Sequence, residues 1–264
     1  MELQKIIYTV EDGIAVIQMN YMKNLNAIDD QMADEMLYVL DAADQDPAVK
    51  VVILKGGDKA FSAGGDIGYF YNVIQGGGEI NIDGLVAKVG VIADKMKRLS
   101  KMIITSVNGA AAGAGASIAF SGDFLVCADN AKFILAFVNI GLVPDTGATY
   151  LLSKSIGTAR ALDLAATGRA MGAEEAKAVG AAYQVVPKEE LEEATMKLAK
   201  KLAAGPTLSY KNIKKQIYNA VYGDYQTWLE ETEMNTQREC VASMDFQEGV
   251  KAFVEKRKAN FQGK

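Results

Sequence analysis

Two glycine- and alanine-rich segments carry the residue types that could hold a reacting oxygen atom. Residues 59–66 read KAFSAGGD and residues 108–117 read NGAAAGAGAS, and each follows an apolar run of strand length. Small side chains let a ligand approach the backbone closely, and N–H groups at the start of a helix attract an anionic oxygen. Together the segments can supply one N–H each to a single carbonyl oxygen, as in an oxyanion hole. Local sequence leaves a simple strand-to-helix turn and close helix–sheet packing open as alternatives.

Asp145 is the acidic residue best placed to act as a base on carbon. It stands in the sequence LVPDTG at residues 142–147, and residues 133–144 before it contain no charged side chain. A carboxylate held against such an apolar flank is partly desolvated, which raises its pKa toward the range that proton abstraction from carbon requires. The alternative is that Asp145 is only the N-cap of a helix over residues 146–155.

The absence of histidine narrows the chemistry further. The chain of 264 residues has none, which excludes Ser-His-Asp and Cys-His nucleophile systems, HExxH zinc sites and histidine bases. Acid–base work therefore falls to a carboxylate, lysine, tyrosine or cysteine. Cys127 and Cys240 are far apart and form no CxxC motif, so we expect two buried thiols and neither a disulfide framework nor a zinc cluster.

Patterns for phosphate, nucleic-acid and membrane binding are not found. Neither glycine-rich segment matches GxxxxGK[ST], and a dinucleotide GxGxxG motif would need glycine at Ile118. The 28 basic and 33 acidic residues give a net charge of −5, which argues against a nucleic-acid surface. Residues 102–122 are uncharged but contain four glycines and several polar side chains, too many for a lipid-facing helix. We expect no metal or redox cofactor, and the lack of a signal-peptide pattern predicts a cytoplasmic location.

The hydrophobic pattern predicts an α/β protein with a helical end. A hairpin is expected at residues 5–10 and 14–19 around a three-residue Glu11-Asp12-Gly13 loop, and Asp29 is expected to cap a helix. Further strands are predicted at 51–54, 102–107, 124–128, 132–135 and 183–186, with helices at 85–99, 146–155, 158–167 and 173–179. The last predicted elements are all helices, at 189–202, 206–222, 225–244 and 245–260. We therefore divide the chain into a body, 1–205, and a helical region, 206–264.

Five short segments then suggest a family. They read NLNA at 24–27, AFSAGGD at 60–66, NG and GAG between 108 and 115, IGLVP at 140–144 and AFVEKRKANF at 252–261. In this order, and over essentially the whole length, the chain resembles the crotonase (enoyl-CoA hydratase/isomerase) superfamily. The resemblance implies an α/β fold made of a crotonase-like spiral of ββα units, with a C-terminal helical trimerisation region that assembles a homotrimer or a dimer of trimers. It also implies an acyl-coenzyme A thioester as substrate, so that coenzyme A is not a separate cofactor.

The resemblance also implies roles for individual residues. The backbone N–H groups of Gly65 and Ala114 would form the oxyanion hole. Lys258 and Phe261 would lie near the adenine end of coenzyme A, in the same or a neighbouring subunit. Further substrate contacts are predicted at Lys23, Ala63, Asp66, Ile67 and Phe137. The aromatic residues Tyr69, Phe70, Tyr71 and Tyr150 fit either an acyl pocket or the core, and the sequence leaves this open.

The positions at which this sequence differs from the hydratases of the family indicate which reaction to expect. Hydratases of the family use two glutamates to hold and activate water, and the matching positions here are Ser117 and Phe137. Asp145 matches an aspartate that is essential in some isomerases of the family and in its 4-chlorobenzoyl-CoA dehalogenase. We predict an acyl-CoA isomerase that works through an oxyanion-stabilised enolate, with Asp145 as the acid and base. The alternatives are a hydratase, a dehalogenase or a decarboxylase of the same family, or a non-catalytic acyl-CoA-binding protein. The dehalogenase has a Trp at the position of Phe137, whereas the sole Trp of this sequence is Trp228.

Overall fold

The main sheet of the computed structural model, which describes residues 1–78 and 82–261, is almost entirely parallel. It has six strands in the order β1-β2-β3-β5-β7-β10, and only the β1–β2 pair is antiparallel. The strands are β1 (Ile6–Glu11), β2 (Ile14–Met19), β3 (Val51–Lys55), β5 (Met102–Val107), β7 (Phe124–Ala128) and β10 (Gln184–Val186). Residues of β5 are buried throughout, as expected for a parallel strand covered on both faces.

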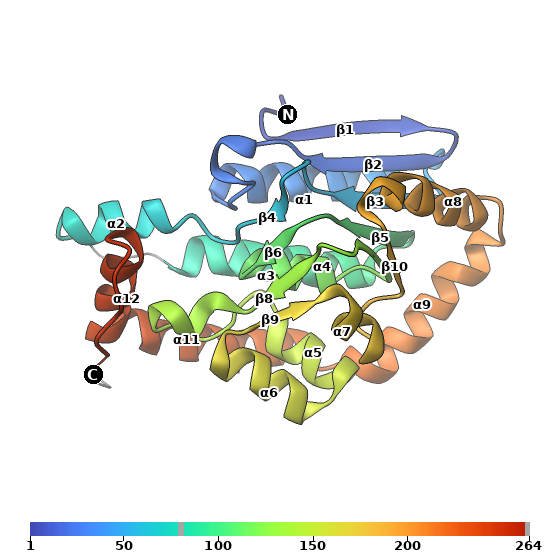
Figure 1. Cartoon of the computed structure of the whole chain (residues 1–264). Helices are drawn as coiled ribbons and strands as arrows, with labels where there is room; N and C mark the ends of the chain where they lie inside the picture. Colours follow the sequence, from blue (N-terminus) through green and yellow to red (C-terminus); the bar gives the residue numbers. More distant parts are fainter. Residues whose placement is uncertain (79–81, 262–264) are drawn as a thin grey trace.

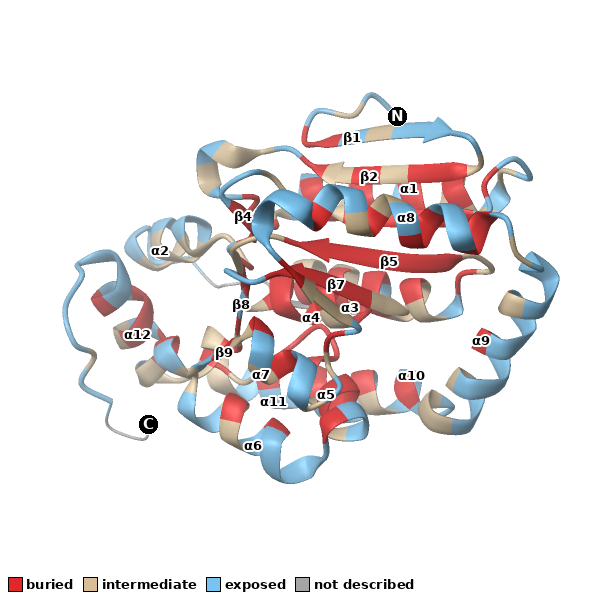
Figure 2. Ribbon diagram, turned by 45° about the vertical axis from the view of Figure 1, so that its right-hand side comes forward, coloured by how far each residue is buried: buried red, intermediate tan, exposed pale blue. Residues whose placement is uncertain are grey.

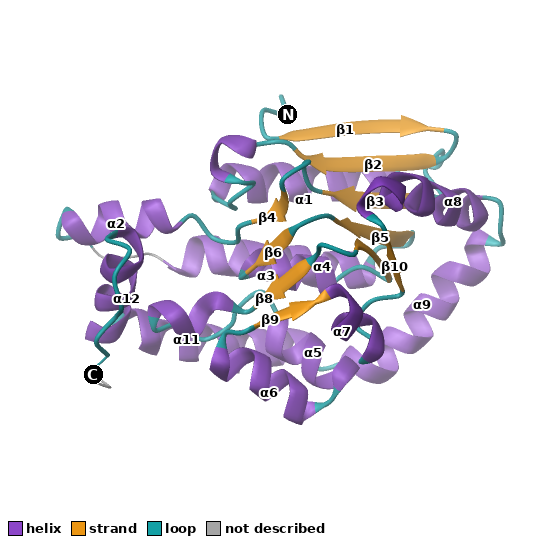
Figure 3. Cartoon of the chain, viewed as in Figure 1, coloured by secondary structure: helices purple, strands orange, loops and turns teal. Residues whose placement is uncertain are grey.

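A second, smaller sheet runs beside the first (Figure 3). Its strands, in order, are β4 (Ala60–Ser62), β6 (Ala110–Ala112), β8 (Lys132–Ile134) and β9 (Ala170–Gly172). Along the chain each of β3, β5 and β7 is followed by one strand of this sheet, and then by helical structure. The predicted spiral of ββα units is therefore confirmed. Strands β4 and β6 are not among the strands that the sequence predicts, because segments of only three residues are too short to show hydrophobic alternation.

Helices cover the main sheet on both faces (Figure 1). α1 (Asp30–Gln45) and α3 (Ile82–Arg98) pack into the larger core, whereas α8 (Leu191–Ala203) covers the other face through Leu191, Leu198 and Leu202. The Asp29 carboxylate caps α1 by accepting from the Met32 N–H, as predicted. The shorter helices are α2 (Ile67–Gln75), α4 (Ala114–Phe120), α5 (Ala148–Ile156), α6 (Thr158–Thr167) and α7 (Ala173–Ala178). Within the described ranges, no helix combines the length and apolar character needed to cross a membrane.

The N-terminal hairpin forms, but its turn is tighter than predicted. Glu11 pairs with Ile14 in the strand ladder, so the loop contains only two residues. Both of them, Asp12 and Gly13, have positive φ angles of 50° and 78°. Two consecutive left-handed residues match the right-handed twist of the strands, which explains why the shorter turn is preferred.

The C-terminal region consists of helices, as predicted, although in more pieces. They are α9 (Thr207–Tyr222), α10 (Tyr225–Trp228), the π-helical turn η4 (Leu229–Glu233), α11 (Met234–Val241) and α12 (Met244–Val254). The single helix expected over residues 225–244 is thus wrong, because the Ser243 side chain caps a new helix and a π-turn interrupts the first. The last helix also ends earlier than residue 260. α12 packs beside α2, on the left of Figure 1.

A buried ion pair anchors α9, whose surface is otherwise largely exposed (Figure 2). The Lys214 ammonium donates to Asp123 Oδ2 at 2.8 Å and to the carbonyl oxygens of Met96 and Lys101. The side chains of the pair are only 3% and 7% exposed. Asp123 also accepts from the Ile103 N–H and the Tyr218 hydroxyl, so both charges are surrounded by partners.

We expect Lys214→Ala to lower the free energy of unfolding by about 3–5 kcal/mol, because Asp123 would remain buried without its cation. The matched control is Arg98→Ala, since the Arg98–Asp94 pair lies at the surface with the arginine side chain 56% exposed. That substitution should cost less than about 1 kcal/mol. Urea denaturation of the two variants measures the difference, and equal losses would contradict the assigned role of Lys214.

Candidate active site

Both glycine-rich segments and Asp145 meet at one cavity, as the sequence predicts. The cavity has a volume of about 250 Å³, and Gly65, Ala114 and Asp145 all line it. Gly65 directly precedes the loop into α2, and Ala114 is the first residue of α4. Within residues 1–78 and 82–261, the Gly65 N–H donates to no other backbone group, and the Ala114 N–H, at the first position of α4, has no acceptor inside its helix. Two backbone donors at the wall of one cavity are therefore free for a ligand oxygen.

The first of these segments is held by the neighbouring loop that contains Asn26. The Asn26 side chain donates to the carbonyl oxygen of Phe61 at 3.1 Å, and Ser62 Oγ donates to the Asn26 carbonyl at 2.8 Å. Ser62 Oγ in turn accepts from the Gly64 N–H, and the Ile28 N–H donates to the Gly64 carbonyl. The NLNA segment thus acts on the site indirectly, by fixing the backbone next to Gly65.

The two segments approach each other so closely that only glycine fits at Gly64. Its φ angle is +88°, and a Cβ atom there would lie 2.6 Å from the carbonyl oxygen of Ala112. The same close approach recurs at Gly115, where a Cβ atom would lie 2.7 Å from the Ser62 side chain. These contacts bring the chain around Gly65 against the start of α4, which places the two N–H groups on one cavity.

Asp145 faces the cavity and is not the N-cap of α5. The N-cap is Gly147, which has no side chain to cap the helix. Instead Asp145 Oδ1 accepts from the Thr146 hydroxyl at 2.8 Å, and Oδ2 accepts from the Gln237 amide at 3.0 Å. The local alternative of a simple helix cap is therefore wrong, because Thr146 and Gly147 adopt left-handed φ angles of 60° and 74° that delay the helix.

Burial gives Asp145 the pKa of an acid–base group. The residue is only 8% exposed, and the cavity wall around it is mainly aliphatic and aromatic. This burial raises the pKa of Asp145 to about 6, although the hydrogen bonds from Thr146 and Gln237 act in the opposite direction. A carboxyl with this pKa exchanges its proton near neutral pH.

Gln237 and Glu233 stand behind Asp145 and were not expected from the sequence. Gln237 lines the cavity, and Glu233 Oε2 accepts from the Gly147 N–H at 2.8 Å. They are 1% and 2% exposed. Their sequence region reads as a polar helix rich in Glu and Gln, so neither residue could be distinguished from its solvated neighbours.

Three of the predicted substrate contacts line the cavity and the others do not. Ala63, Ile67 and Phe137 belong to its wall. Asp66 caps α2 by accepting from the Gly68 N–H at 2.9 Å. The remaining three, Lys23, Lys258 and Phe261, are exposed and lie outside the lining.

Of Ser117 and the four aromatic candidates, only Phe70 lines the cavity. Ser117 lies under the cavity, where its hydroxyl donates to the Asp145 carbonyl oxygen at 3.2 Å. Phe70 reaches the lining, whereas Tyr69 and Tyr71 do not. Tyr150 bonds to Asp224 and packs against Tyr225, so it belongs to a small core cluster.

Part of the cavity wall comes from helices that sequence patterns could not assign to the site. Val86 and Val89 of α3 line it, as do Val241 of α11 and Phe253 of α12. The C-terminal region is thus part of the site within a single chain. The two cysteines stand apart from it: both are free, and Cys240 is only half-buried, contrary to expectation.

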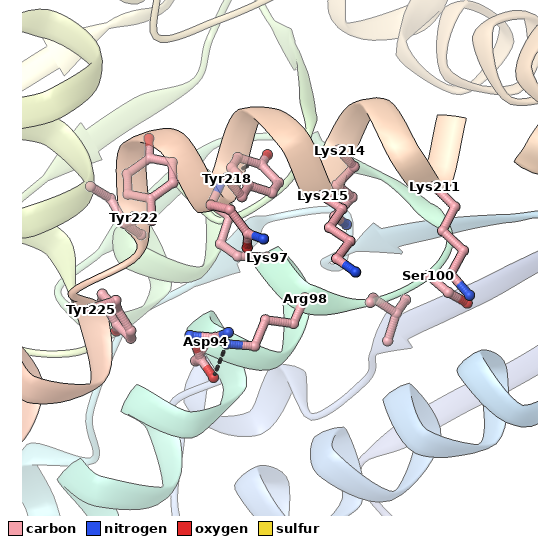
Figure 4. Close-up of a pocket in the computed structure, with 13 residues that line it drawn as sticks. Asp94, Lys97, Arg98, Ser100, Lys211, Lys214, Lys215, Tyr218, Tyr222 and Tyr225 are labelled. Carbon is pink, nitrogen blue, oxygen red and sulfur yellow. Dashed lines mark hydrogen bonds and ion pairs between the residues drawn. The ribbon is translucent and has the colours of Figure 1, made fainter. Parts of the chain in front are cut away.

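A second pocket, of about 210 Å³, lies between the end of α3 and α9 (Figure 4). Lysine and tyrosine side chains of α9 line it together with Lys97 and Arg98. Its acidic residue Asp94 is paired with Arg98, and the Lys97 ammonium donates to the Phe120 and Gly122 carbonyl oxygens. No proton acceptor in this pocket compares with Asp145, so the first cavity is the candidate active site.

Comparison with known proteins agrees with this geometry. Residues 9–264 match the family model described as Enoyl-CoA hydratase/isomerase. The chain is 35% identical over its full length to all of the trans-2-decenoyl-[acyl-carrier-protein] isomerase of Streptococcus mutans. It is also 35% identical, over 99% of this chain and all of the relative, to the 1,2-epoxyphenylacetyl-CoA isomerase of Escherichia coli. The crystal structure of an enoyl-CoA hydratase from Mycobacterium avium subsp. paratuberculosis covers 99% of the chain and is itself fully covered, with a TM-score of 0.90 and 30% identity.

The fold and the site therefore define an enzyme of the crotonase class. More specifically, the chain belongs to the enoyl-CoA hydratase/isomerase family. The relatives named above include both isomerases and a hydratase, so the fold alone leaves the reaction open.

The raised pKa of Asp145 predicts a pH-dependent stability that needs no substrate. The folded chain binds this proton more tightly than the unfolded chain, whose Asp pKa is near 3.8. The free energy of unfolding should therefore fall by about 3 kcal/mol in total as pH rises through the range from about 3.8 to about 6. Asp145→Asn has no such proton to lose, so this variant should not show the fall. Urea denaturation at pH 4 and pH 8, between which about 2 kcal/mol of this decrease occurs, tests the prediction, with the exposed Asp129→Asn as the matched control. A variant no more stable than the parent at pH 8 would refute the raised pKa.

Proposed function

We propose that the protein is an acyl-CoA isomerase that moves a double bond with Asp145 as its single acid–base group. One observation carries this proposal: among the described residues that line the cavity, Asp145 alone has an ionisable side chain. One carboxyl is sufficient for isomerisation, because the proton that leaves one carbon can return to another. Hydration needs groups that activate water and also protonate carbon.

The proposed reaction uses the two free N–H groups and Asp145 in turn. With a 3-enoyl thioester, the Asp145 carboxylate removes a proton from C2, and the electron pair of that bond moves onto the thioester oxygen. The Gly65 and Ala114 N–H groups stabilise the negative charge of the resulting dienolate. Asp145 then returns the proton at C4 as the double bond forms between C2 and C3. Atoms and charge balance, and the enzyme ends in its starting state.

The environment of Asp145 suits both half-reactions. Ionised above a pKa of about 6, it is a base at neutral pH, and its burial makes the protonated form a ready acid. The apolar walls keep water away from the dienolate. The Gln237 amide and the Thr146 hydroxyl hold both carboxylate oxygens in place.

The structure supports the alternatives less well. The positions that carry the hydratase glutamates are a buried serine bonded to backbone, Ser117, and the wall residue Phe137. A dehalogenase would need an indole near the carboxylate, and Trp228 instead packs on Tyr150, with ring centroids 5.0 Å apart. In a protein that only binds acyl-CoA, a buried carboxyl beside two unpaired N–H groups would have no function.

We also propose that the chain assembles as a homotrimer or a dimer of trimers. The support is the exposed apolar surface of α9, where Ile213 and Ile217, 46% and 54% exposed, are one helical turn apart.

Size-exclusion chromatography with light scattering should give a mass of three or six chains, and Ile217→Glu should reduce this mass. A monomer at micromolar concentration would contradict the assembly.

Asp145→Asn tests the reaction directly. The variant should lose at least about 10³-fold in kcat for double-bond migration, because an amide neither accepts nor returns the proton. The parent, this variant and the control Asp129→Asn are each incubated with 3-enoyl-CoA and 2-enoyl-CoA thioesters. Migration is followed by absorbance and water addition by mass. Migration that persists in Asp145→Asn, or efficient hydration by the parent, would overturn the proposal.

A further inference from the structure

Two buried side chains behind Asp145 each have an oxygen atom without a hydrogen-bond donor. Among the residues that the structure describes, these atoms are Oε1 of Glu233 and Oε1 of Gln237. The two residues are 2% and 1% exposed, so bulk solvent does not supply the missing donors. An unpaired buried acceptor is costly, and two acceptors cannot satisfy each other. A proton on one of the two groups would resolve both cases.

The position of this proton follows from the helix. Glu233 ends η4, and Gln237 lies four residues later in α11, which continues directly from it. Side chains at this spacing lie on the same face of a helix. A proton on Glu233 Oε1 turns this atom into a donor, and Gln237 Oε1 is the acceptor on the same face. At this spacing a single proton would give both oxygens a partner.

We propose that Glu233 is a neutral carboxylic acid in the working enzyme and is a positioning residue for Asp145. Its hydroxyl donates to Gln237 Oε1, and the Gln237 amide N–H donates to Asp145 Oδ2 at 3.0 Å. Its other oxygen accepts from the Gly147 N–H at 2.8 Å. Glu233 thus fixes both the amide that faces Asp145 and the backbone turn that carries it.

The charges around Glu233 favour the neutral form. Burial, and then the negative charge of Asp145, raise the pKa of Glu233 to about 8, against the opposing N–H groups of Thr146 and Gly147. Tyr225 of α10 faces the same group, and burial together with Glu233 raises the pKa of its phenol, which stays uncharged. Asp94 of α3 also acts on Tyr225, but its charge is paired with Arg98.

Ionisation of Glu233 should disable the site. It withdraws the donor from Gln237 and places a second negative charge near Asp145, so the amide that holds Asp145 Oδ2 is no longer fixed. The inference rests on the proposed isomerase for its kinetic test. The rate constant kcat/KM should rise as Asp145 ionises near pH 6 and fall again as Glu233 ionises near pH 8.

Glu233→Gln separates this role from simple packing. The substituted amide keeps an acceptor for Gly147 and a donor for Gln237, so activity at pH 7 should stay within about twofold of the parent. The alkaline fall should disappear, leaving kcat/KM at pH 9 about tenfold above the parent. Glu233→Ala should lose at least about tenfold in kcat at every pH, with little change in KM. Glu231→Gln, exposed in the same π-turn, is the matched control and should keep the parent's profile.

Two kinetic outcomes would refute the proposal. An alkaline fall that persists in Glu233→Gln would assign it to another group. A Glu233→Gln variant as impaired as Glu233→Ala would show that the site needs the charge of Glu233 and not its proton.

A measurement without substrate keeps this test separate from the proposed reaction. Because the folded chain holds the Glu233 proton up to about pH 8, the urea midpoint of the parent should fall between pH 6.5 and pH 9. The midpoint of Glu233→Gln should fall less, and that of Glu231→Gln should follow the parent. Parallel curves for all three proteins would show that Glu233 is already ionised at neutral pH. This result stands whether or not Asp145→Asn supports the isomerase.

Discussion

The site depends on the burial of one carboxyl group in an apolar cavity. Asp145 is 8% exposed, and its charged form loses solvation that the protein replaces only in part, with the Thr146 hydroxyl and the Gln237 amide. The remaining destabilisation is what moves its pKa into the useful range. Stability and reactivity are therefore opposed at this residue, as is common where a functional group is tuned by its surroundings.

Holding Asp145 toward the cavity requires an unusual backbone. Thr146 is β-branched and has a φ angle of 60°, a conformation that costs about 1–3 kcal/mol and persists only where surrounding contacts stabilise it. Those contacts come from distant parts of the chain. The Ser117 hydroxyl bonds to the Asp145 carbonyl, and the Glu233 carboxyl bonds to the Gly147 N–H. α4 and η4 thus hold the two ends of one strained turn.

The same spiral serves isomerases and hydratases, so the choice of reaction lies in which acids face the cavity. The close contact of Gly64 with Ala112 brings the Gly65 and Ala114 N–H groups to one cavity. In the proposed reaction these groups stabilise the negative charge on the thioester oxygen. The Asp145 carboxyl transfers the proton in that proposed reaction. With Phe137 at the wall and Ser117 beneath it, Asp145 is the ionisable side chain among the described residues that line the cavity.

The sequence by itself determined the main strands and the α1 cap at Asp29, because periodicity and capping are local properties. The joint site of the two glycine-rich segments and Asp145 was expected from the family resemblance. The sequence did not reveal the strands β4 and β6, whose pairing is non-local and which contain only three residues each. It also left Asp145 open between helix cap and base. Tertiary structure decided this, because the left-handed Thr146 turns the carboxylate toward Gln237, a residue 92 positions away. The burial of Glu233 likewise depends on packing between distant parts of the chain, so the local pattern of polar residues could not predict it.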